Sequence, residues 1–204
     1  MVFYGNGEYE PYSTTNGNEG KSYSWYSSGP EIKHVIFEKG VTKIEESSFD
    51  NHNYPNYPIL KNVRIGNSVT SIGADSFHAC KLITTITIPE SVISIGIHAF
   101  EHCSSLTIVV IKSTNQLTFS YEVFWSCKKL STIYFYSLIE PIYDTRTTCY
   151  TASDGSYGCG SSSSPVSCVP FYCETPSITV YVPKNYNSTA TTFCGKSVTF
   201  KREL

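Results

Sequence analysis

The feature that most constrains the fold is an internal repeat. The segment Ser-Val-Thr-Ser-Ile-Gly-Ala-Asp-Ser-Phe-His-Ala-Cys at residues 68–80 returns as Ser-Val-Ile-Ser-Ile-Gly-Ile-His-Ala-Phe-Glu-His-Cys at residues 91–103, which is 23 residues later. A fixed period in the twenties is typical of solenoids, in which one small unit stacks on copies of itself and each copy buries the hydrophobic face of its neighbour. Such stacks commonly serve as binding surfaces, so the repeat bears on function as well as on fold.

The same register extends along most of the chain. Each unit follows the pattern Cys-x-x-Leu-x-x-Ile-x-Ile, a short link, and Val-x-x-Ile-Gly-x-x-x-Phe-x-x-Cys, and one complete copy runs from Cys80 to Cys103. The residues that close the strand of each unit recur at spacings of 28, 23, 23, 24 and 47. They are Phe37, Ile65, Ile88, Ile111, Phe135 and Val182. The last spacing of 47 residues, from Phe135 to Val182, is about two repeats long. It predicts about one more repeat, which either accompanies an irregular segment or is made unrecognisable by it.

Short runs with a period of two predict one β-strand per unit. Residues 86–88 (Ile-Thr-Ile) alternate as expected of a strand with one buried face. Strands that all run in the same direction form a parallel sheet, in which neighbours lie about 4.8 Å apart. A second extended piece ends at Gly73 or Gly96, where a tight reversal would use the freedom of glycine at positive φ, whereas Glu45 and Ser120 replace glycine in other units. No segment has a sustained helical period, so strands and loops should dominate.

The repeated pattern resembles that of the BspA-like leucine-rich repeats, a family of surface proteins and adhesins of bacteria and parasitic protists. The match is strongest over residues 60–135, and the Tyr- and Trp-containing stretch 23–40 resembles the lead-in before the first repeat of that family. Residues 180–186 and 192–195 resemble its C-terminal ending. The resemblance implies an α/β horseshoe-type leucine-rich repeat solenoid, dominated by strands, with one strand of a parallel sheet per repeat of about 23 residues.

The expected organisation is a single elongated domain with four parts. Residues 1–30 form an aromatic N-terminal cap, and residues 31–137 form the leucine-rich repeats. Residues 138–176 form an irregular insertion, rich in Cys, Ser and Gly, that includes a degenerate repeat. Residues 177–204 form the last strands and a C-terminal cap.

Composition and charge narrow the classes of function. The chain of 204 residues has a formal net charge of −2 and no run of basic residues, which argues against nucleic acid as a partner, because that affinity depends on Lys and Arg neutralising phosphates. No stretch approaches the roughly 18 consecutive apolar residues that indicate a membrane span. No signal peptide is visible, so a surface role requires that the signal was removed or that export is unconventional. The expected location is the cell surface or the medium, with the cytoplasm as the alternative.

Seven of the eight cysteines fall into two groups. Three occupy the same position in successive units and should be small buried hydrophobes with free thiols, since stacked side chains do not converge as a disulfide requires. They are Cys80, Cys103 and Cys127. Four others lie in a segment rich in Thr, Ser, Gly and Pro that disulfides would hold together. They are Cys149, Cys159, Cys168 and Cys173.

The state of the second cysteine group stays open at this point. Four cysteines permit three pairings, and the sequence does not choose among them. One alternative is free thiols, with Cys173 as a degenerate repeat cysteine. The other is a metal site, although spacings of ten, nine and five lack the short Cys-x-x-Cys pairs of structural zinc modules.

Three histidines near the repeat cysteines raise the question of metal or catalytic chemistry. They are His78, His98 and His102. In the alignment of the repeats, His98 is equivalent to Asp75 and His102 to Ala79. Positions that accept unrelated residues are typical of a solvent-facing surface, so the alignment disfavours metal or catalytic chemistry. The chain also lacks a nucleophile elbow, a phosphate loop and a His-Glu-x-x-His pair. The sequence therefore predicts no catalytic residue, no metal ligand and no cofactor; a hydrolase or metal enzyme using these turns is the weakest alternative.

If the protein acts by recognition, the outward face of the sheet is the predicted binding surface. The expected contact residues stand between the inward residues of successive strands. They are Ile36, Arg64, Thr87, Ile108, Val110, Tyr134 and Tyr181. Aromatic residues and Arg dominate interface hot spots, and contiguous exposed apolar area usually marks a contact. The alternative is that residues 138–176 cover part of this face, or that these side chains serve strand formation alone.

The sequence thus favours a non-enzymatic protein-binding module. By resemblance, its expected role is that of a cell-surface adhesin that binds a host or extracellular matrix protein. The alternative is an intracellular scaffold or regulatory protein that binds a cellular partner. The open ends of the solenoid also leave room for self-association.

Overall fold

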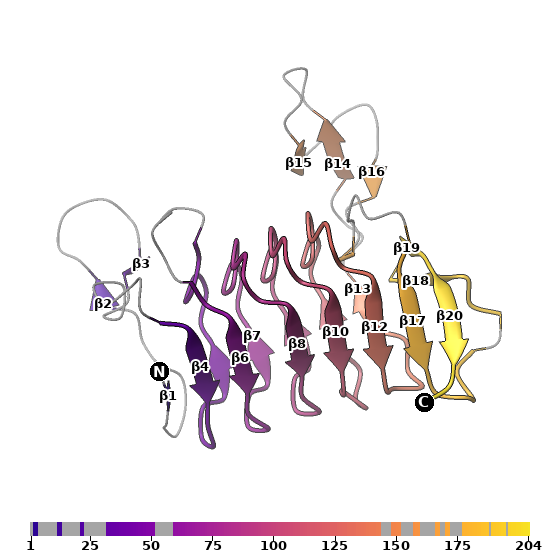
Figure 1. Ribbon diagram of the computed structural model, residues 1–204, viewed down its shortest axis with the longest axis horizontal. Helices are drawn as coiled ribbons and strands as arrows, with labels where there is room; N and C mark the ends of the chain where they lie inside the picture. Colours follow the sequence, from indigo (N-terminus) through magenta and orange to yellow (C-terminus); the bar gives the residue numbers. More distant parts are fainter. Residues whose placement is uncertain are drawn as a thin grey trace.

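The computed structural model describes six ranges of the chain and the backbone of six short strands outside them. The ranges are 32–51, 59–143, 170–171, 177–187, 189–194 and 196–204. The described residues form an elongated stack of rungs that follow one another in chain order (Figure 1). No helix occurs in these parts of the chain, and accordingly none that is long and apolar enough to cross a membrane.

The front layer of the stack is built from parallel strands, one per rung (Figure 1). Its strands are β1 (Val2–Phe3), β4 (His34–Phe37), β6 (Asn62–Ile65), β8 (Thr85–Ile88), β10 (Ile108–Ile111), β12 (Thr132–Phe135), β17 (Thr179–Val182) and β20 (Thr199–Arg202). They pair in the orders β1-β4-β6 and β8-β10-β12-β17-β20. Strands β4 to β17 end at the six residues that the repeat predicted, from Phe37 to Val182, so the predicted strand register is confirmed.

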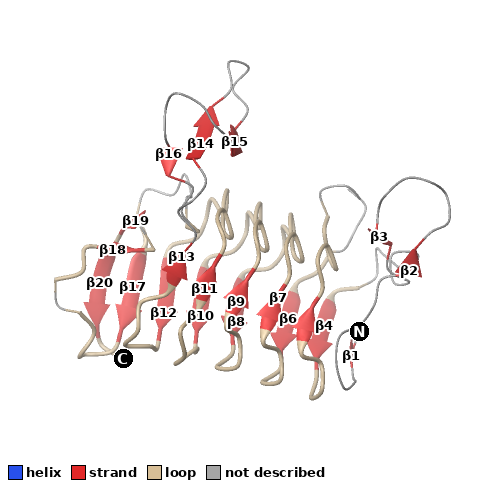
Figure 2. Cartoon of the chain, turned by 180° about the vertical axis from the view of Figure 1, so that it is seen from behind, coloured by secondary structure: helices blue, strands red, loops and turns tan. Residues whose placement is uncertain are grey.

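The second extended piece of each unit forms a rear sheet, seen from behind in Figure 2. Its strands are β5 (Lys43–Ile44), β7 (Ser71–Ile72), β9 (Ser94–Ile95), β11 (Thr118–Phe119) and β13 (Ile142–Tyr143). They are also parallel and follow the order β5-β7-β9-β11-β13. The prediction of a strand-dominated leucine-rich repeat solenoid is therefore confirmed.

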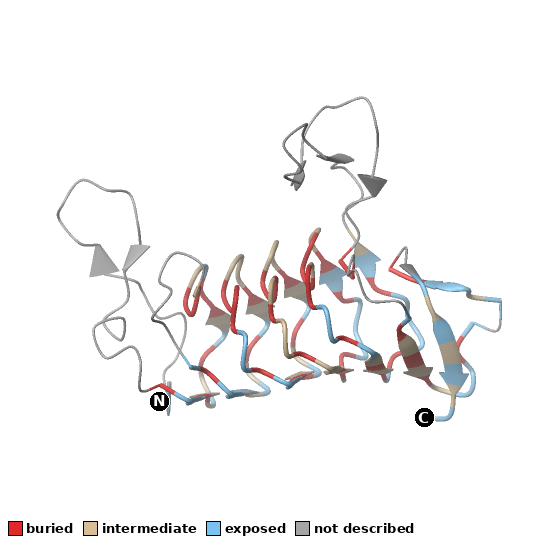
Figure 3. Ribbon diagram, turned by 45° about the horizontal axis from the view of Figure 1, so that its top comes forward, coloured by how far each residue is buried: buried red, intermediate tan, exposed pale blue. Residues whose placement is uncertain are grey.

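The hydrophobic core lies between the two sheets (Figure 3). Inward side chains on the front strands are almost completely buried, whereas their neighbours along the strand are exposed or half-buried. Phenylalanine rings from successive turns extend this core as a ladder: Phe49, Phe77, Phe100, Phe124 and Phe171 stack at centroid distances of 5.6, 5.3, 5.3 and 4.8 Å. Each such pair contributes about 0.5–1.5 kcal/mol beyond the buried area.

The repeat cysteines reinforce the ladder, as free buried thiols. Each thiol donates a hydrogen bond to the carbonyl oxygen of a phenylalanine in the preceding rung: Cys80 to Phe49 and Cys103 to Phe77 at 3.3 Å, and Cys127 to Phe100 at 3.1 Å. Burial raises the pKa of the Cys103 thiol to about 12. The prediction of buried free thiols at these three positions is confirmed.

Gly73 and Gly96 were expected to adopt positive φ, and this expectation is wrong. Glycine is needed at these positions because the backbone of the preceding rung approaches too closely for a side chain. A Cβ on Gly73 would lie 2.6 Å from the Glu46 nitrogen, and a Cβ on Gly96 would lie 2.5 Å from the Ala74 nitrogen. Each glycine thus lets its rung pack against the backbone of the rung before it. Glu45 follows β5, the terminal strand of this sheet, so no earlier rung in the sheet opposes its side chain.

The left-handed backbone lies instead in the turns that follow the rear strands. Two positions in each of three successive turns have φ near +55°, occupied by Asp75 and Ala79 in one rung and by His98 and His102 in the next. Left-handed φ is uncommon for residues other than glycine. Backbone hydrogen bonds between rungs hold this conformation, for example from the Ala79 nitrogen to the Glu101 oxygen at 2.7 Å. Equivalent turn residues are therefore stacked directly on one another.

The spacing of 47 residues before Val182 reflects one enlarged rung. Strand β17 pairs directly with β12, with Thr179 opposite Thr132, so the expected further repeat adds no strand to the front sheet. The rear position is taken by β13, and the ladder position by Phe171, whose neighbour Pro170 accepts a hydrogen bond from the Phe124 nitrogen. The insertion thus falls within a single rung, between its rear strand and its phenylalanine.

The remaining short strands pair in an antiparallel manner. They are β2 (Tyr12–Ser13) with β3 (Lys21–Ser22), β14 (Thr148–Thr151) with β15 (Tyr157–Cys159) and β16 (Val166–Ser167), and β18 (Thr192–Phe193) with β19 (Lys196–Ser197). The backbone register places Cys149 opposite Cys159. Cys168 and Cys173 lie outside the described residues.

Candidate functional site

Six of the seven predicted contact residues form one outward column on the front sheet. Ile36 pairs with Arg64. In the other ladder, Thr87, Val110, Tyr134 and Tyr181 are consecutive partners. Ile108 lies in the neighbouring column, between Thr85 and Thr132. All seven predicted residues are exposed or half-buried, so the structure brings them to one face as the alternation indicated.

The C-terminal half of this column is a stack of aromatic and cationic side chains. The rings of Tyr134 and Tyr181 stack at a centroid distance of 4.8 Å with an interplanar angle of 21°. The Lys201 ammonium lies 5.3 Å from the Tyr181 ring centroid and donates to the Tyr181 hydroxyl at 3.5 Å. Lys201 enters the column because β20 pairs with β17, a contact that the alternation of residues 199–202 could have indicated. We call Tyr134, Tyr181 and Lys201 the tyrosine platform.

The N-terminal end of the column borders an open pocket. The pocket has a volume of about 610 Å³. It is lined by Glu38, Lys39, Arg64, Ile65, Gly66, Asn67 and Ser68. The Arg64 guanidinium lies 3.6 Å from the Glu38 carboxylate, and its side chain is 68 % exposed, so this pair is a weak surface contact. Arg64 is thus available to an approaching partner.

A second group of side chains lies along the turns, where the sequence predicted only solvent-facing histidines. Two columns run from rung to rung, each with an acid, a histidine and an acid. They are Asp50, His78 and Glu101, and Asp75, His98 and Glu122. We call these six residues with His102 the turn cluster. The expectation of exposure is wrong for His78, which is 8 % exposed, and for Ala79, the equivalent of His102, which is 3 % exposed.

Ion pairs connect the turn cluster within and between its columns. His98 Nε2 lies 2.9 Å from Glu122 Oε2, and its Nδ1 lies 3.5 Å from Asp75 Oδ1. The same Nδ1 lies 3.4 Å from Glu101 Oε2 in the other column. Acids and histidines occupy equivalent positions of successive rungs because they pair with each other from rung to rung. This alternation of acid and histidine along a column is the signal that position-by-position comparison missed.

The close contacts of the turn cluster shift the pKa values of His98 and Glu101. Burial alone would lower the pKa of His98, but hydrogen bonds with Asp75 and Glu122 outweigh it and raise the pKa to about 10. Burial raises the pKa of Glu101 to about 7, against the lowering effect of His98 and His78. His98 is therefore positively charged at neutral pH and partly offsets the surrounding carboxylates.

Comparison with known proteins bears on both sites. The sequence matches the BspA type leucine rich repeat region, with six copies over residues 19–146, which is more than half of the chain. The chain belongs to the BspA-type leucine-rich repeat family. The resemblance drawn from the repeat is thereby confirmed. No curated protein and no solved structure matches the sequence.

Family membership sets the general class of function. Leucine-rich repeat domains are protein-interaction modules, and the family is generally non-enzymatic. The matched residues include every rung from β4 to β13, and therefore most of the outward column and the whole turn cluster.

Proposed function

We propose that this BspA-type protein binds a host or extracellular matrix protein through the outward column of its front sheet, as a cell-surface adhesin. The observation that carries the proposal is the tyrosine platform, in which two half-buried tyrosines stack at 4.8 Å on a regular sheet. Tyrosine provides a large contact area at low entropic cost, and aromatic residues are enriched at interface hot spots. The rigid sheet holds the two rings in place before binding, so little ordering is required of this protein.

The charge near the two ends of the column supports a partner with acidic groups. Arg64 lies near one end of the column, next to Ile36, and Lys201 lies at the other end, five strands further along, which at about 4.8 Å per strand corresponds to roughly 24 Å. Thr87, Val110 and the tyrosines occupy the space between them. A complementary partner therefore presents an aliphatic or aromatic patch flanked by acidic groups. Such complementarity favours correct orientation and faster association.

Alanine substitution of the platform tests the proposal. Tyr134→Ala and Tyr181→Ala are each expected to weaken binding to a matrix protein by about 10–30-fold, since each removes one of the two stacked rings from the platform. Binding is measured by surface plasmon resonance with a panel of purified collagens and extracellular matrix glycoproteins immobilised. Ile93→Ala is the matched control, because Ile93 is 49 % exposed but precedes β9 in the rear sheet. Binding equal to wild type in both tyrosine variants would reject the platform, and a panel that binds nothing would reject the matrix-protein role.

The adhesin role also predicts the state of the insertion cysteines. Directly opposite residues of antiparallel strands have Cα atoms about 4.5–5.5 Å apart, which is within the range of a disulfide. We therefore expect a Cys149–Cys159 bond in exported protein, with Cys80, Cys103 and Cys127 remaining thiols. Differential alkylation and peptide mass mapping of protein from its native cell measures this. Eight free thiols would instead favour the intracellular scaffold.

A further inference from the structure

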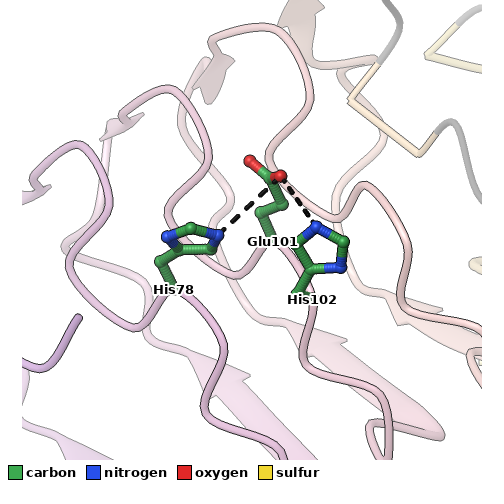
Figure 4. Close-up of side chains that lie close together, drawn as sticks. All are labelled: His78, Glu101 and His102. Carbon is green, nitrogen blue, oxygen red and sulfur yellow. Dashed lines mark ion pairs between the residues drawn. The ribbon is translucent and has the colours of Figure 1, made fainter. Parts of the chain in front are cut away.

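Three members of the turn cluster direct ligand atoms toward one point (Figure 4). His78 Nε2 lies 3.8 Å from Glu101 Oε1, and His102 Nε2 lies 3.3 Å from the same oxygen. The three ligand atoms all lie within 4.8 Å of one another. His78 and Glu101 are buried and come from adjacent rungs, so the backbone of two stacked turns fixes their separation.

These distances suit a transition-metal ion. Zinc binds imidazole nitrogen and carboxylate oxygen at about 2.0–2.2 Å, so two ligands of a tetrahedral site lie about 3.4 Å apart. The distances of 3.3 and 3.8 Å to Glu101 lie close to this value. The half-buried His102 side chain, which is 38 % exposed, is the ligand with freedom to close on the ion from the solvent side. Two histidines and one carboxylate leave at least one coordination position open to water.

The surroundings of the three residues provide the outer shell that metal ligands usually have. A metal-bound histidine commonly gives its other ring nitrogen to a carboxylate, which fixes the ring orientation. His78 Nδ1 lies 3.1 Å from Asp50 Oδ1, and Asp50 is 4 % exposed. The His102 ring is held from the other side by Trp125, at a centroid distance of 5.2 Å. Both imidazoles are thus oriented with their Nε2 atoms toward Glu101.

The charge of the turn cluster also favours a cation. Four acidic side chains, from Asp50, Asp75, Glu101 and Glu122, each lie within 3.5 Å of a histidine nitrogen of this cluster. Three of these carboxyl residues are less than one-tenth exposed. Buried carboxylates are costly unless paired, and a divalent cation beside Glu101 would provide such a partner.

We propose that His78, Glu101 and His102 bind one Zn²⁺ ion that joins two adjacent rungs. The site differs from the metal hypothesis that the sequence suggested, because His98 is not a ligand. His98 instead holds the second oxygen of Glu101, at 3.4 Å from Oε2, and so directs Oε1 toward the ion. Because the ligands come from two rungs that must be folded to meet, the ion stabilises the stacked state over the unfolded chain.

Zinc titration of the full chain, prepared without a histidine tag and treated with a chelator, tests the proposal. Calorimetry is expected to give one Zn²⁺ per chain, and zinc should raise the melting temperature. Glu101→Gln and His102→Ala should each weaken binding by at least about 100-fold, and Asp50→Asn by about 10–100-fold through the orientation of His78. Circular dichroism in chelator checks that each variant folds; His102 is half-exposed, so its loss is least harmful to the turn.

Two controls separate this site from other zinc-binding groups. His34→Ala removes a histidine that is exposed on the front sheet, and it should leave the affinity unchanged. A variant with serine at the four insertion cysteines, Cys149, Cys159, Cys168 and Cys173, should also bind normally. With Co²⁺ in place of Zn²⁺, a His and Glu site lacks the intense near-ultraviolet band of thiolate ligands. Retained binding in both Glu101→Gln and His102→Ala, loss of binding in the serine variant, or no binding by the wild type would overturn the proposal.

Discussion

Phe100→Ala is expected to lower the free energy of unfolding by about 3–5 kcal/mol, the largest single effect that the core predicts. Phe100 is fully buried and stacks on Phe77 and on Phe124, each at a centroid distance of 5.3 Å. Its loss removes two ring contacts and leaves a cavity between adjacent rungs. In a solenoid each rung is stabilised mainly by its neighbours, so a defect in a central rung weakens two interfaces at once. Urea unfolding followed by circular dichroism measures the change.

Two companion variants make this result specific to the ladder. Leu82→Ala removes a side chain of comparable chemistry that is 42 % exposed, and its effect should stay within about 0.5 kcal/mol. Phe100→Leu keeps most of the buried volume but no ring, so its effect should fall between the two. A Phe100→Ala variant that unfolds at the same urea concentration as Leu82→Ala would show that the ladder does not hold the rungs together.

The regular part of the solenoid was predictable because its strands obey a simple rule. Each front strand alternates inward aliphatic or aromatic residues with outward ones, and a slip of one residue would expose the whole inward set. The strand ends from Phe37 to Val182 were therefore identifiable from the sequence alone. The enlarged rung was not, because the spacing of 47 residues fits either an added strand or a long insertion, and only the pairing of β17 with β12 distinguishes them.

The two candidate sites also differ in how far the sequence predicts them. The outward column follows from alternation within a strand, so Tyr134 and Tyr181 were predicted to share a face. The turn cluster depends on contacts between equivalent positions of neighbouring rungs. The replacement of His98 by Asp75 in the preceding rung suggested tolerance of any residue, whereas the two side chains lie 3.5 Å apart and form an ion pair. In a stacked repeat, residues at equivalent positions of neighbouring rungs contact each other. Variation at such a position therefore indicates exposure only when the successive residues do not form ion pairs or other specific contacts with each other.

Gly96→Ala is expected to lower the free energy of unfolding by about 2–3 kcal/mol, opposite in sign to the usual small gain from replacing glycine. The added Cβ would lie 2.5 Å from the Ala74 nitrogen and 2.8 Å from the Gly73 carbonyl carbon. Both atoms belong to the backbone of the preceding rung, so no side-chain rotation relieves the contact. The Gly96 nitrogen also donates to the Ile72 oxygen at 2.8 Å, which holds the two rungs at this separation. Thermal and urea unfolding both report the loss.

Ser120→Ala is the matched control for this variant, because Ser120 occupies the equivalent position one rung later and already carries a Cβ. Its nitrogen donates to the Ile95 oxygen at 2.9 Å, so the equivalent hydrogen bond joins this rung to the one before it, and its Cβ is already accommodated there. Ser120→Ala should change stability by no more than about 0.5 kcal/mol. If Gly96→Ala instead stabilises the protein by the 0.4–1 kcal/mol typical of reduced chain entropy, the rungs are separated enough to admit a side chain. The glycine at this position would then be a feature of the repeat pattern without a packing requirement behind it.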